Sequence, residues 1–313
     1  MPVLLAGVTG VGSQDHQSSM WAPRLEAAGF FPAGVWSPPE EGERADAARR
    51  LAQSLDVSLS TEPSPPAVEG AVIACLRGEA RARLLSTVPA GTAVLVDKPT
   101  LDATDELAHQ LSGTSAQLLS GLHLAAHPSF TRVASAVRDG EIGLLRAVMV
   151  DLVVARGDGA SPEGDLRNIG VHAADLLQRL TGPASVTIAT ASLASDQVTL
   201  LGQTDRDVVL SAHVSRIADG DGTVLARLRA VGSHGHVSVD LTAPALTVRT
   251  AHGTRSAGYG ADSVTARLRQ LRAIADGRRA GETAESWLST SRLLDAVGES
   301  ARSGASVTVE KSN

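Results

Sequence analysis

The chain of 313 residues contains only two lysines, and one of them stands where it could do chemistry. Lys311 is close to the C-terminus, whereas Lys98 follows the apolar run 93–96 and an acid, Asp97. Lysine can give up its proton near neutral pH in a suitable environment, and arginine cannot. A lysine at the end of a buried strand can therefore hydrogen-bond a substrate hydroxyl and help to move its proton. A surface turn formed by Asp97 and Lys98 is the alternative.

A glycine-rich turn follows the first apolar run, residues 3–6. It reads Gly7-Val8-Thr9-Gly10-Val11-Gly12. In a dinucleotide-binding turn the first glycine permits the bend, and the last allows the helix to pack closely on the strand. Thr9 replaces the middle glycine, but backbone N–H groups at the start of a helix can still hold a phosphate. A turn without a ligand is the alternative.

The end of the second expected strand, residues 34–36, bears on the choice of nucleotide. An acidic residue at this place would bind the adenosine ribose of NAD. The sequence has Trp36 and Ser37 there, and Ser37 can accommodate a 2′-phosphate without repelling it. The nearest arginine in the following sequence is Arg44. We therefore favour NADP slightly over NAD.

A polar stripe runs along an expected helix in the second half of the chain. Its members are spaced by four, three and four residues, which places them on one helix face: Asn168, His172, Asp175 and Arg179. If this face lines a cleft, His172 can donate or accept a proton and Asp175 can orient its ring. A solvated helix face is the alternative.

These residues need elements to position them, and the first 120 residues alternate apolar runs with helical segments. The runs at 3–6, 34–36, 71–76 and 93–96 end at glycine or polar residues, as buried strands do. Helical patterns cover 24–29 and 44–55. Strands separated by helices indicate βαβ units and a parallel sheet. We therefore predict a dinucleotide-binding Rossmann domain over residues 1–120.

From about residue 121 the pattern changes to strands with few helices. A helix is expected over 128–138, because Pro128 suits its first turn and Gly140 follows its end. Strands are expected at 145–155, 185–193, 197–201, 208–214, 223–231, 235–241 and 245–249, and helices at 262–276 and 284–302. We predict a substrate-binding α+β domain over 121–313, with an open, mainly antiparallel sheet and flanking helices. Its final helix can pack back on the first domain.

Composition and charge narrow the class of protein. Hydrophobic residues make up 43% of the chain and charged residues 20%, as is usual for globular proteins. The net charge of −6 comes without a basic stripe, which argues against a nucleic-acid partner. The apolar runs are too short to span a membrane, and the N-terminus lacks the basic region of a signal peptide. We expect a cytoplasmic protein that acts on a small molecule.

The cysteine and histidine content predicts neither a disulfide framework nor a metal centre. Cys75 is the only cysteine, which suits a reducing compartment, and its apolar strand predicts a buried side chain. His123 and His127 have no third ligand nearby in the sequence, and Pro128 indicates that the helix begins after them. We therefore predict no bound metal.

Several short motifs follow one another along nearly the whole chain. They are Gly91-Thr92-Ala93-Val94 leading to Asp97-Lys98-Pro99, His127-Pro128-Ser129-Phe130, Asp139-Gly140-Glu141-Ile142-Gly143, Gly170-Val171-His172 with Asp175-Leu176-Leu177, and Ser300-Ala301-Arg302-Ser303-Gly304 with Val307. In order and spacing they resemble the glucose-fructose oxidoreductase and inositol dehydrogenase family, called Gfo/Idh/MocA.

This resemblance implies NAD(P)-dependent oxidation or reduction of a carbinol or ketone on a sugar, a sugar derivative or a cyclitol. It implies that Lys98 orients the reacting oxygen and that His172 is the acid or base. It also implies homodimers or homotetramers built through the open sheet. The cofactor would lie along these residues: Gly7, Thr9, Gly10, Val11, Gly12, Trp36, Ser37, Ala74, Cys75, Leu76, Asp97 and Lys98.

Three departures from the family pattern keep other functions open. Asn168 stands where the family usually has an aspartate, and it cannot ionise. Thr9 replaces a glycine, and the segment 77–81 lacks a histidine that is common there. One alternative is a redox-neutral epimerase or lyase with a tightly bound nicotinamide. Another is a non-catalytic regulatory protein that binds a nucleotide or a sugar.

Overall fold

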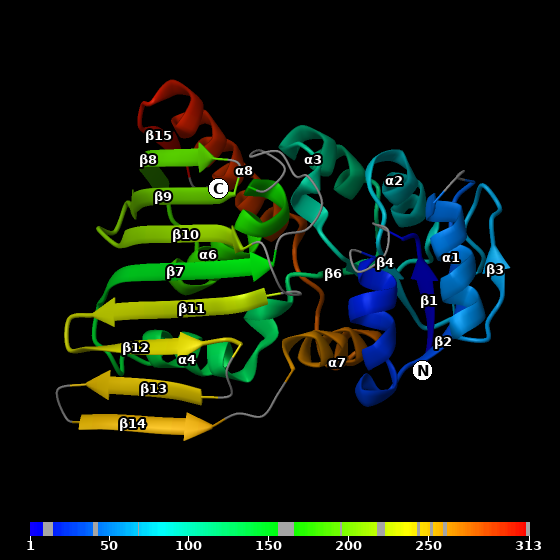
Figure 1. Cartoon of the computed structure of the whole chain (residues 1–313), viewed down its shortest axis with the longest axis horizontal. Helices are drawn as coiled ribbons and strands as arrows, with labels where there is room; N and C mark the ends of the chain where they lie inside the picture. Colours follow the sequence, from blue (N-terminus) through cyan, green and yellow to red (C-terminus); the bar gives the residue numbers. More distant parts are fainter. Residues whose placement is uncertain are drawn as a thin grey trace. The chain divides into compact units, whose positions relative to one another are not determined.

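A six-stranded parallel sheet forms the centre of the first half of the chain (Figure 1). The strand order β3-β2-β1-β4-β5-β6 reverses between β1 and β4, and ligands bind at such a reversal, outside the carboxyl ends of the strands. The predicted Rossmann sheet is confirmed. Its strands are β1 (Pro2–Ala6), β2 (Phe31–Trp36), β3 (Leu59–Ser60), β4 (Ala71–Ala74), β5 (Ala93–Val96) and β6 (Gln117–Ser120).

The computed structural model describes residues 1–8, 15–39, 43–67, 69–155, 166–194, 196–217, 223–242, 245–250, 253–258 and 262–310. The chain divides into two compact units. The first unit is Met1–His123 with Val264–Leu288, and the second is Leu124–Ser263 with Ser289–Asn313.

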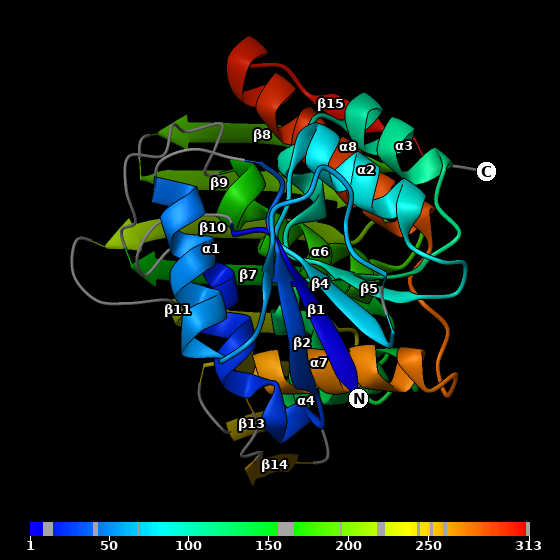
Figure 2. The same cartoon turned by 90° about the vertical axis from the view of Figure 1, so that its right-hand side faces the viewer.

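Helices cover both faces of the parallel sheet (Figure 2). Leu5, Ile73 and Leu95 pack on one side with α1 (Glu43–Ser54) and α7 (Ser263–Ala275). Leu4, Val72, Val94 and Val96 alternate with them and pack on the other side. The helices there are α2 (Gly78–Thr87), α3 (Thr104–Ser112) and the start of α8 (Ala284–Ser303). Burial on both faces explains why these strands read as continuous apolar runs.

The segment after the glycine-rich turn is an irregular helix. A π-helical turn, η2 (Gln17–Trp21), leads into two 3₁₀ turns, η3 (Ala22–Arg24) and η4 (Glu26–Ala28). The helical pattern expected over 24–29 therefore falls on these 3₁₀ turns, and the segment is not an α-helix. Pro23 has no N–H group to donate, and Gly29 ends the segment in the left-handed conformation, with φ of 80°.

Residues 264–288 complete the first unit by covering the edge of β6. The N–H of Glu282 donates to the carbonyl of Leu118 at 2.7 Å, as a neighbouring strand would. The Glu282 carboxylate accepts from the N–H of Ser120 at 2.9 Å and pairs with Arg267 at 2.8 Å. Arg267 is buried and also donates to the carbonyl of Ser120. The edge strand is thus protected by a segment far away in sequence.

The second unit is built on a nine-stranded sheet in the order β14-β13-β12-β11-β7-β10-β9-β8-β15. Its neighbouring strands are antiparallel except for β7 and β10, which are parallel. The predicted, mainly antiparallel sheet is therefore confirmed. The strands are β7 (Leu145–Ala155), β8 (Val186–Ala194), β9 (Gln197–Thr204), β10 (Val209–Ile217), β11 (Thr223–Gly232), β12 (Gly235–Asp240), β13 (Ala245–Thr250), β14 (Gly253–Gly258) and β15 (Val307–Val309).

Two helices pack on one face of this sheet (Figure 1). α6 (Val171–Thr181) contacts β7 and β10, and α4 (Pro128–Arg138) contacts β11 and β12. α4 begins where expected, because Pro128 occupies its first turn and the ring of His127 accepts the N–H of Ser129 at 3.2 Å. The strand residues facing the helices are buried, including Val150, Leu210 and Leu228.

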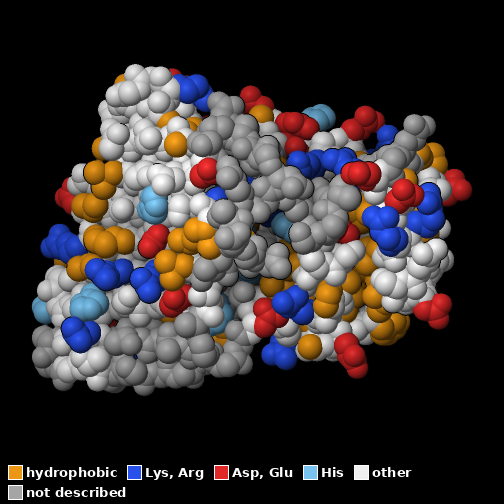
Figure 3. All heavy atoms as spheres, viewed as in Figure 1, with side chains coloured by type: hydrophobic (Ala, Val, Ile, Leu, Met, Phe, Trp, Pro, Cys, Tyr) orange, Lys and Arg blue, Asp and Glu red, His pale blue; other side chains and the backbone are white. Residues whose placement is uncertain are grey.

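The opposite face of the sheet carries exposed apolar side chains (Figure 3). Met149 on β7, Leu201 on β9, and Val209 and Ile217 on β10 are 39–45% exposed. Charged residues lie between them, since Asp151 of β7 has His213 on one neighbouring strand and Arg227 on the other. This open face of the sheet is therefore apolar with a polar row across it.

Candidate active site

Lys98 lies at the carboxyl end of a central parallel strand. β5 ends at Val96, and Asp97 and Lys98 follow it at once. This is the edge at which open parallel sheets bind ligands. Lys98 is half-buried, and its backbone is extended, with φ of −134° and ψ of 85°. The predicted surface-turn alternative is wrong for Asp97, because that side chain is buried.

Both carboxylate oxygens of Asp97 accept hydrogen bonds from the segment after the glycine-rich turn. Nδ1 of His16 lies 2.8 Å from one oxygen, and the indole N–H of Trp21 donates to the other at 2.9 Å. Burial acts to raise the pKa of Asp97, but the charges of His16 and Lys98 and these hydrogen bonds outweigh it and lower the pKa to about 2. Asp97 is therefore an ionised buried group beside Lys98.

The backbone of Asp97 is fixed as tightly as its side chain. Its N–H donates to the carbonyl of Ala74 on β4 at 2.9 Å. On the other side Gly121, which follows β6, lies directly against it. A β-carbon on Gly121 would stand 2.3 Å from the carbonyl oxygen of Asp97. Only a glycine fits there without moving the backbone.

A buried arginine holds the carbonyl of Lys98. Arg81 on α2 donates to that carbonyl at 3.3 Å and pairs with Asp102 at 2.5 Å. Its Nε also donates to the side-chain oxygen of Gln110 at 2.6 Å. Burial lowers the pKa of Arg81, while the nearby carboxylates of Asp102 and Glu106 act in the opposite direction. The peptide group that follows Lys98 is thus held in place by Arg81 of α2.

Gly7 has the conformation that a nucleotide-binding turn requires. Its φ is 75°, and its N–H donates to the carbonyl of Trp36 at 2.7 Å. A β-carbon there would come within 2.6 Å of the carbonyl oxygen of Cys75. The chain can therefore bend closely over the strand ends only with glycine at this place. Thr9, Gly10, Val11 and Gly12 lie outside the described residues.

An acidic residue caps the helical segment that follows this turn. Asp15 is buried, and its carboxylate accepts from the N–H of Gln17 at 3.1 Å and from the hydroxyl of Ser18 at 2.5 Å. Burial raises the pKa of Asp15, although these hydrogen bonds act to lower it. The Asp15 carboxylate therefore satisfies the N–H of Gln17 at the start of this helical segment.

The other predicted cofactor residues present backbone rather than side chains. Trp36, Ala74 and Cys75 are 0–1% exposed, and Leu76 is 7% exposed. The indole of Trp36 donates to the carbonyl of Glu62 at 3.0 Å. Ser37 is also buried, and its N–H donates to the carbonyl of Ser60 at 3.0 Å. A nucleotide along this edge would meet mainly peptide groups.

The polar stripe of the second unit is divided between two kinds of helix. Asn168 lies in a π-helical turn, η7 (Leu166–Gly170), and His172 and Asp175 lie in α6. The helix expected around residues 168–180 is therefore present, and its first turn is π-helical. Asn168 and His172 are half-buried, whereas Asp175 is buried and pairs with Arg179 at 2.8 Å. Lys98 and Asp97 belong to the first unit.

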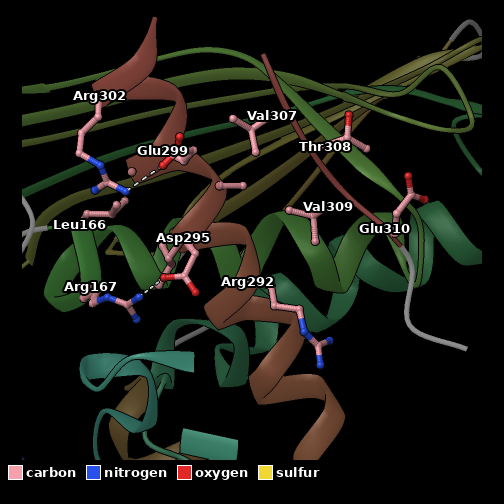
Figure 4. A pocket seen from close by; sticks show the side chains of 13 residues that line it. Leu166, Arg167, Arg292, Asp295, Glu299, Arg302, Val307, Thr308, Val309 and Glu310 are labelled. Carbon is pink, nitrogen blue, oxygen red and sulfur yellow. Dashed lines mark hydrogen bonds and ion pairs between the residues drawn. The ribbon is translucent and has the colours of Figure 1, made fainter. Parts of the chain in front are cut away.

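A surface cavity of about 790 Å³ lies elsewhere in the second unit (Figure 4). η7, α8 and β15 line it, and its charged groups include two ion pairs. Arg167 pairs with Asp295, and Arg302 pairs with Glu299 at 3.2 Å. Neither Asn168 nor His172 lines this cavity.

Among the residues that the structure describes, no three histidine, cysteine, aspartate or glutamate side chains gather as a metal site would need. His123 begins a 3₁₀ turn, η6 (His123–Ala126), and His127 caps α4. No helix within the described ranges is both long and apolar enough to cross a membrane.

The structure adds three residues that sequence reasoning missed: His16, Trp21 and Arg81. His16 and Trp21 follow the glycine-rich turn, and the spacing between them does not by itself reveal that both reach β5. Arg81 is part of the segment noted only for its missing histidine. Nothing in the sequence marked it as buried, because arginine is rarely fully buried unless paired.

The fold of the whole chain is that of several solved oxidoreductases. A myo-inositol dehydrogenase from Corynebacterium glutamicum aligns over 100% of this chain and 99% of its own, with a TM-score of 0.72 and 19% identity. A levoglucosan dehydrogenase in complex with NADH and levoglucosan aligns over 99% of both chains, with a TM-score of 0.79 and 14% identity. A 3-ketoreductase from Actinomadura kijaniata in complex with NADP and TDP-benzene aligns over 96% of this chain and 97% of its own, with a TM-score of 0.72 and 18% identity.

In sequence, no protein-family model and no curated protein matches the chain. The likeness is therefore one of fold, and it extends over both units. It confirms, at the level of fold, the predicted resemblance to enzymes of the Gfo/Idh/MocA type.

Proposed function

We propose that this protein is an NAD(P)-dependent oxidoreductase that transfers hydride between nicotinamide and a carbinol or ketone. The substrate would be a sugar, a sugar derivative or a cyclitol. The observation that carries the proposal is the position of Lys98, which follows the buried Asp97 at the carboxyl end of the parallel strand β5. Structures of the same fold contain NADH or NADP.

Gly7 gives the first unit a place that fits a dinucleotide. Its positive φ and the lack of room for a β-carbon match the close turn that such a ligand needs. The edge beside it presents the buried residues Trp36, Ser37 and Cys75 mainly through their backbone. When bound there, the nicotinamide would supply the hydride donor or acceptor. Ser37 in place of an acid favours NADP slightly over NAD, and Arg44 on α1 is the nearest cation in the sequence after it.

Each catalytic residue would have a distinct role. Lys98 would hydrogen-bond the reacting oxygen and stabilise negative charge on it, because an ammonium is a compact donor. His172 would give or take the proton of the hydroxyl. Asn168 would hydrogen-bond the substrate without ionising. Asp175, which is buried on the same helix, would orient His172.

We also propose that the open face of the second sheet pairs with a second copy of this chain. Met149, Leu201 and Val209 leave apolar surface exposed there, and such patches mark association sites. A two-fold axis would bring the same face of each copy together. Asp151 and Arg227 are neighbours across β7 and β11, so each copy offers both signs of charge to the other.

The proposed activity is tested by turnover on a panel of sugars and cyclitols with each cofactor. Reduced nicotinamide is followed by its absorbance, and products are analysed with and without added cofactor. We expect turnover that falls at least about a hundredfold in Lys98→Ala and in His172→Ala, and not in Lys311→Ala.

Three other outcomes would contradict the proposed activity or point to a different function. Full turnover in Lys98→Ala would show that its assigned role is wrong. A product formed without net change in nicotinamide would show an epimerase or lyase. Cofactor binding without turnover on any compound would support a binding or regulatory protein.

A further inference from the structure

Asp97 ties the strand that precedes Lys98 to the segment that follows the glycine-rich turn. One carboxylate oxygen bonds Nδ1 of His16 at 2.8 Å and the other accepts from Nε1 of Trp21 at 2.9 Å. The Asp97 side chain is 3% exposed. Hydrogen bonds to a buried charged group are stronger than neutral ones, and leaving such a group unpaired is costly. The carboxylate is therefore held in one orientation.

This anchoring matters for Lys98 because a lysine side chain is long and flexible. Successive side chains of an extended backbone point to opposite sides. Since Asp97 is fixed toward the interior, the backbone of Lys98 can direct its own side chain only to the other side. The carbonyl of Lys98 is held as well, by Arg81 at 3.3 Å.

The donors come from a segment that is itself immobilised. Gln17 is completely buried, and its amide nitrogen donates to the carbonyl of Ile73 on β4 at 2.8 Å. Trp21 is completely buried in the core beside β1 and β4. His16, by contrast, keeps 26% of its side chain exposed. The segment is therefore held against the sheet by Gln17 and Trp21, and the ring of His16 is partly exposed to solvent.

We propose that His16 and Trp21 are positioning residues that hold Asp97 and thereby set the direction of Lys98. The arrangement connects the place of the lysine to the segment directly after the nucleotide turn. This inference rests on the proposed function, because that function gives Lys98 a reacting oxygen to orient.

The lysine content of the chain allows a direct test that needs neither substrate nor cofactor. Reductive methylation with ¹³C-formaldehyde labels Lys98, Lys311 and the N-terminal amine. The two lysine methyl signals are assigned by NMR with Lys98→Arg and Lys311→Arg. The shift and pH titration of the Lys98 signal then report its surroundings, and Lys311 is an internal control.

Four variants separate positioning from general damage. His16→Ala removes the donor, whereas His16→Asn keeps an N–H group in the place of Nδ1. Trp21→Phe keeps an aromatic ring in the core and removes only the N–H. His109→Ala changes an exposed histidine of the same unit, on α3, and is the matched control.

We expect the Lys98 signal to move in His16→Ala and in Trp21→Phe, to return in His16→Asn, and to stay unchanged in His109→Ala. With substrate, His16→Ala should lower kcat about tenfold while KM for the cofactor changes by less than about threefold. If His16→Ala does not fold, Trp21→Phe decides the result. If the imidazole of His16 only filled space, the Lys98 signal would not return in His16→Asn, because that variant keeps the N–H group and loses the ring.

An unchanged Lys98 signal in a folded His16→Ala or Trp21→Phe protein would overturn the proposal. The proposal would also be overturned if the Lys98 signal moved as far in His16→Asn as in His16→Ala. The same holds if the Lys311 signal moved as much as the Lys98 signal. Failure of the proposed function looks different. In that case the wild-type protein would bind neither NADH nor NADPH, while the Lys98 signal would still respond to His16.

Discussion

Gly121 lies so close to Asp97 that a β-carbon on the glycine would stand 2.3 Å from the carbonyl oxygen of the aspartate and 2.6 Å from its Cα. The N–H of Gly121 also donates to the carbonyl of Val96 at 2.6 Å. The residue that follows β6 thus packs directly on the backbone of Asp97, the residue before Lys98.

Gly121→Ala should therefore destabilise the protein. The atoms in the way are backbone atoms, which cannot move aside as the end of a flexible side chain can. We expect the free energy of unfolding in urea to fall by about 3 kcal/mol, the upper part of the range for overpacking. Gly113→Ala is the control, because nothing lies within 4 Å of a β-carbon there, and an equal loss in both variants would contradict this account.

Asp97 should contribute stability that disappears in acid. Its pKa is about 2 in the folded protein against an ordinary 3.8, so the folded state binds the proton less readily than the unfolded state. Its contribution is full above about pH 4 and is lost as the pH falls toward 2, roughly 2 kcal/mol in all. Asp97→Asn should show a flatter dependence of the free energy of unfolding on pH over this window. An equally steep dependence in both proteins would contradict the assignment.

Asp15 should have the opposite effect on how the free energy of unfolding depends on pH. Because burial raises its pKa above 3.8, the folded state binds the proton more readily than the unfolded state. The free energy of unfolding then falls as the pH rises from about 4 through the folded pKa. Asn is as good a helix cap as Asp, so Asp15→Asn should remove this decline and be no less stable at pH 7. A variant that is less stable than wild type at pH 7 would show that the ionised carboxylate stabilises the fold.

Substitutions on the open sheet face should change assembly without unfolding the chain. Met149→Asp and Leu201→Asp place charges on its exposed apolar part, and we expect sedimentation to show monomers where wild type forms dimers or larger assemblies. Phe31→Asp is the matched control, because Phe31 is an exposed apolar residue of the first unit, at 56%. A wild-type monomer, or dissociation in the control alone, would contradict the proposed interface.

Much of the fold could be predicted from sequence where burial imposes a clear period. β5 and β7, at 93–96 and 145–155, lie where their apolar runs indicate, and α4 begins at Pro128 as expected. β14 lies in a segment for which the sequence predicts no strand. Its glycines and polar residues give no apolar pattern, because it is the edge strand of the sheet.

The candidate site could be predicted only where local chemistry marks it. Lys98 was indicated by its place after an apolar run, and Gly7 by its place as the first residue of the glycine-rich turn. His16 and Trp21 meet Asp97 across 81 and 76 residues of sequence. No local pattern encodes such a contact, because the irregular helix that brings both rings to β5 depends on packing against the sheet.

Binding of a nicotinamide cofactor by the first unit is tested most directly by titration with NADH and NADPH separately. Nicotinamide fluorescence and thermal stability are followed for wild type and for Gly7→Ala, in which the β-carbon would meet the Cys75 carbonyl. We expect saturable binding of one cofactor well below about 1 mM in wild type, and loss of that binding in the variant. Binding of neither cofactor by the wild-type protein up to that concentration would contradict the proposed function.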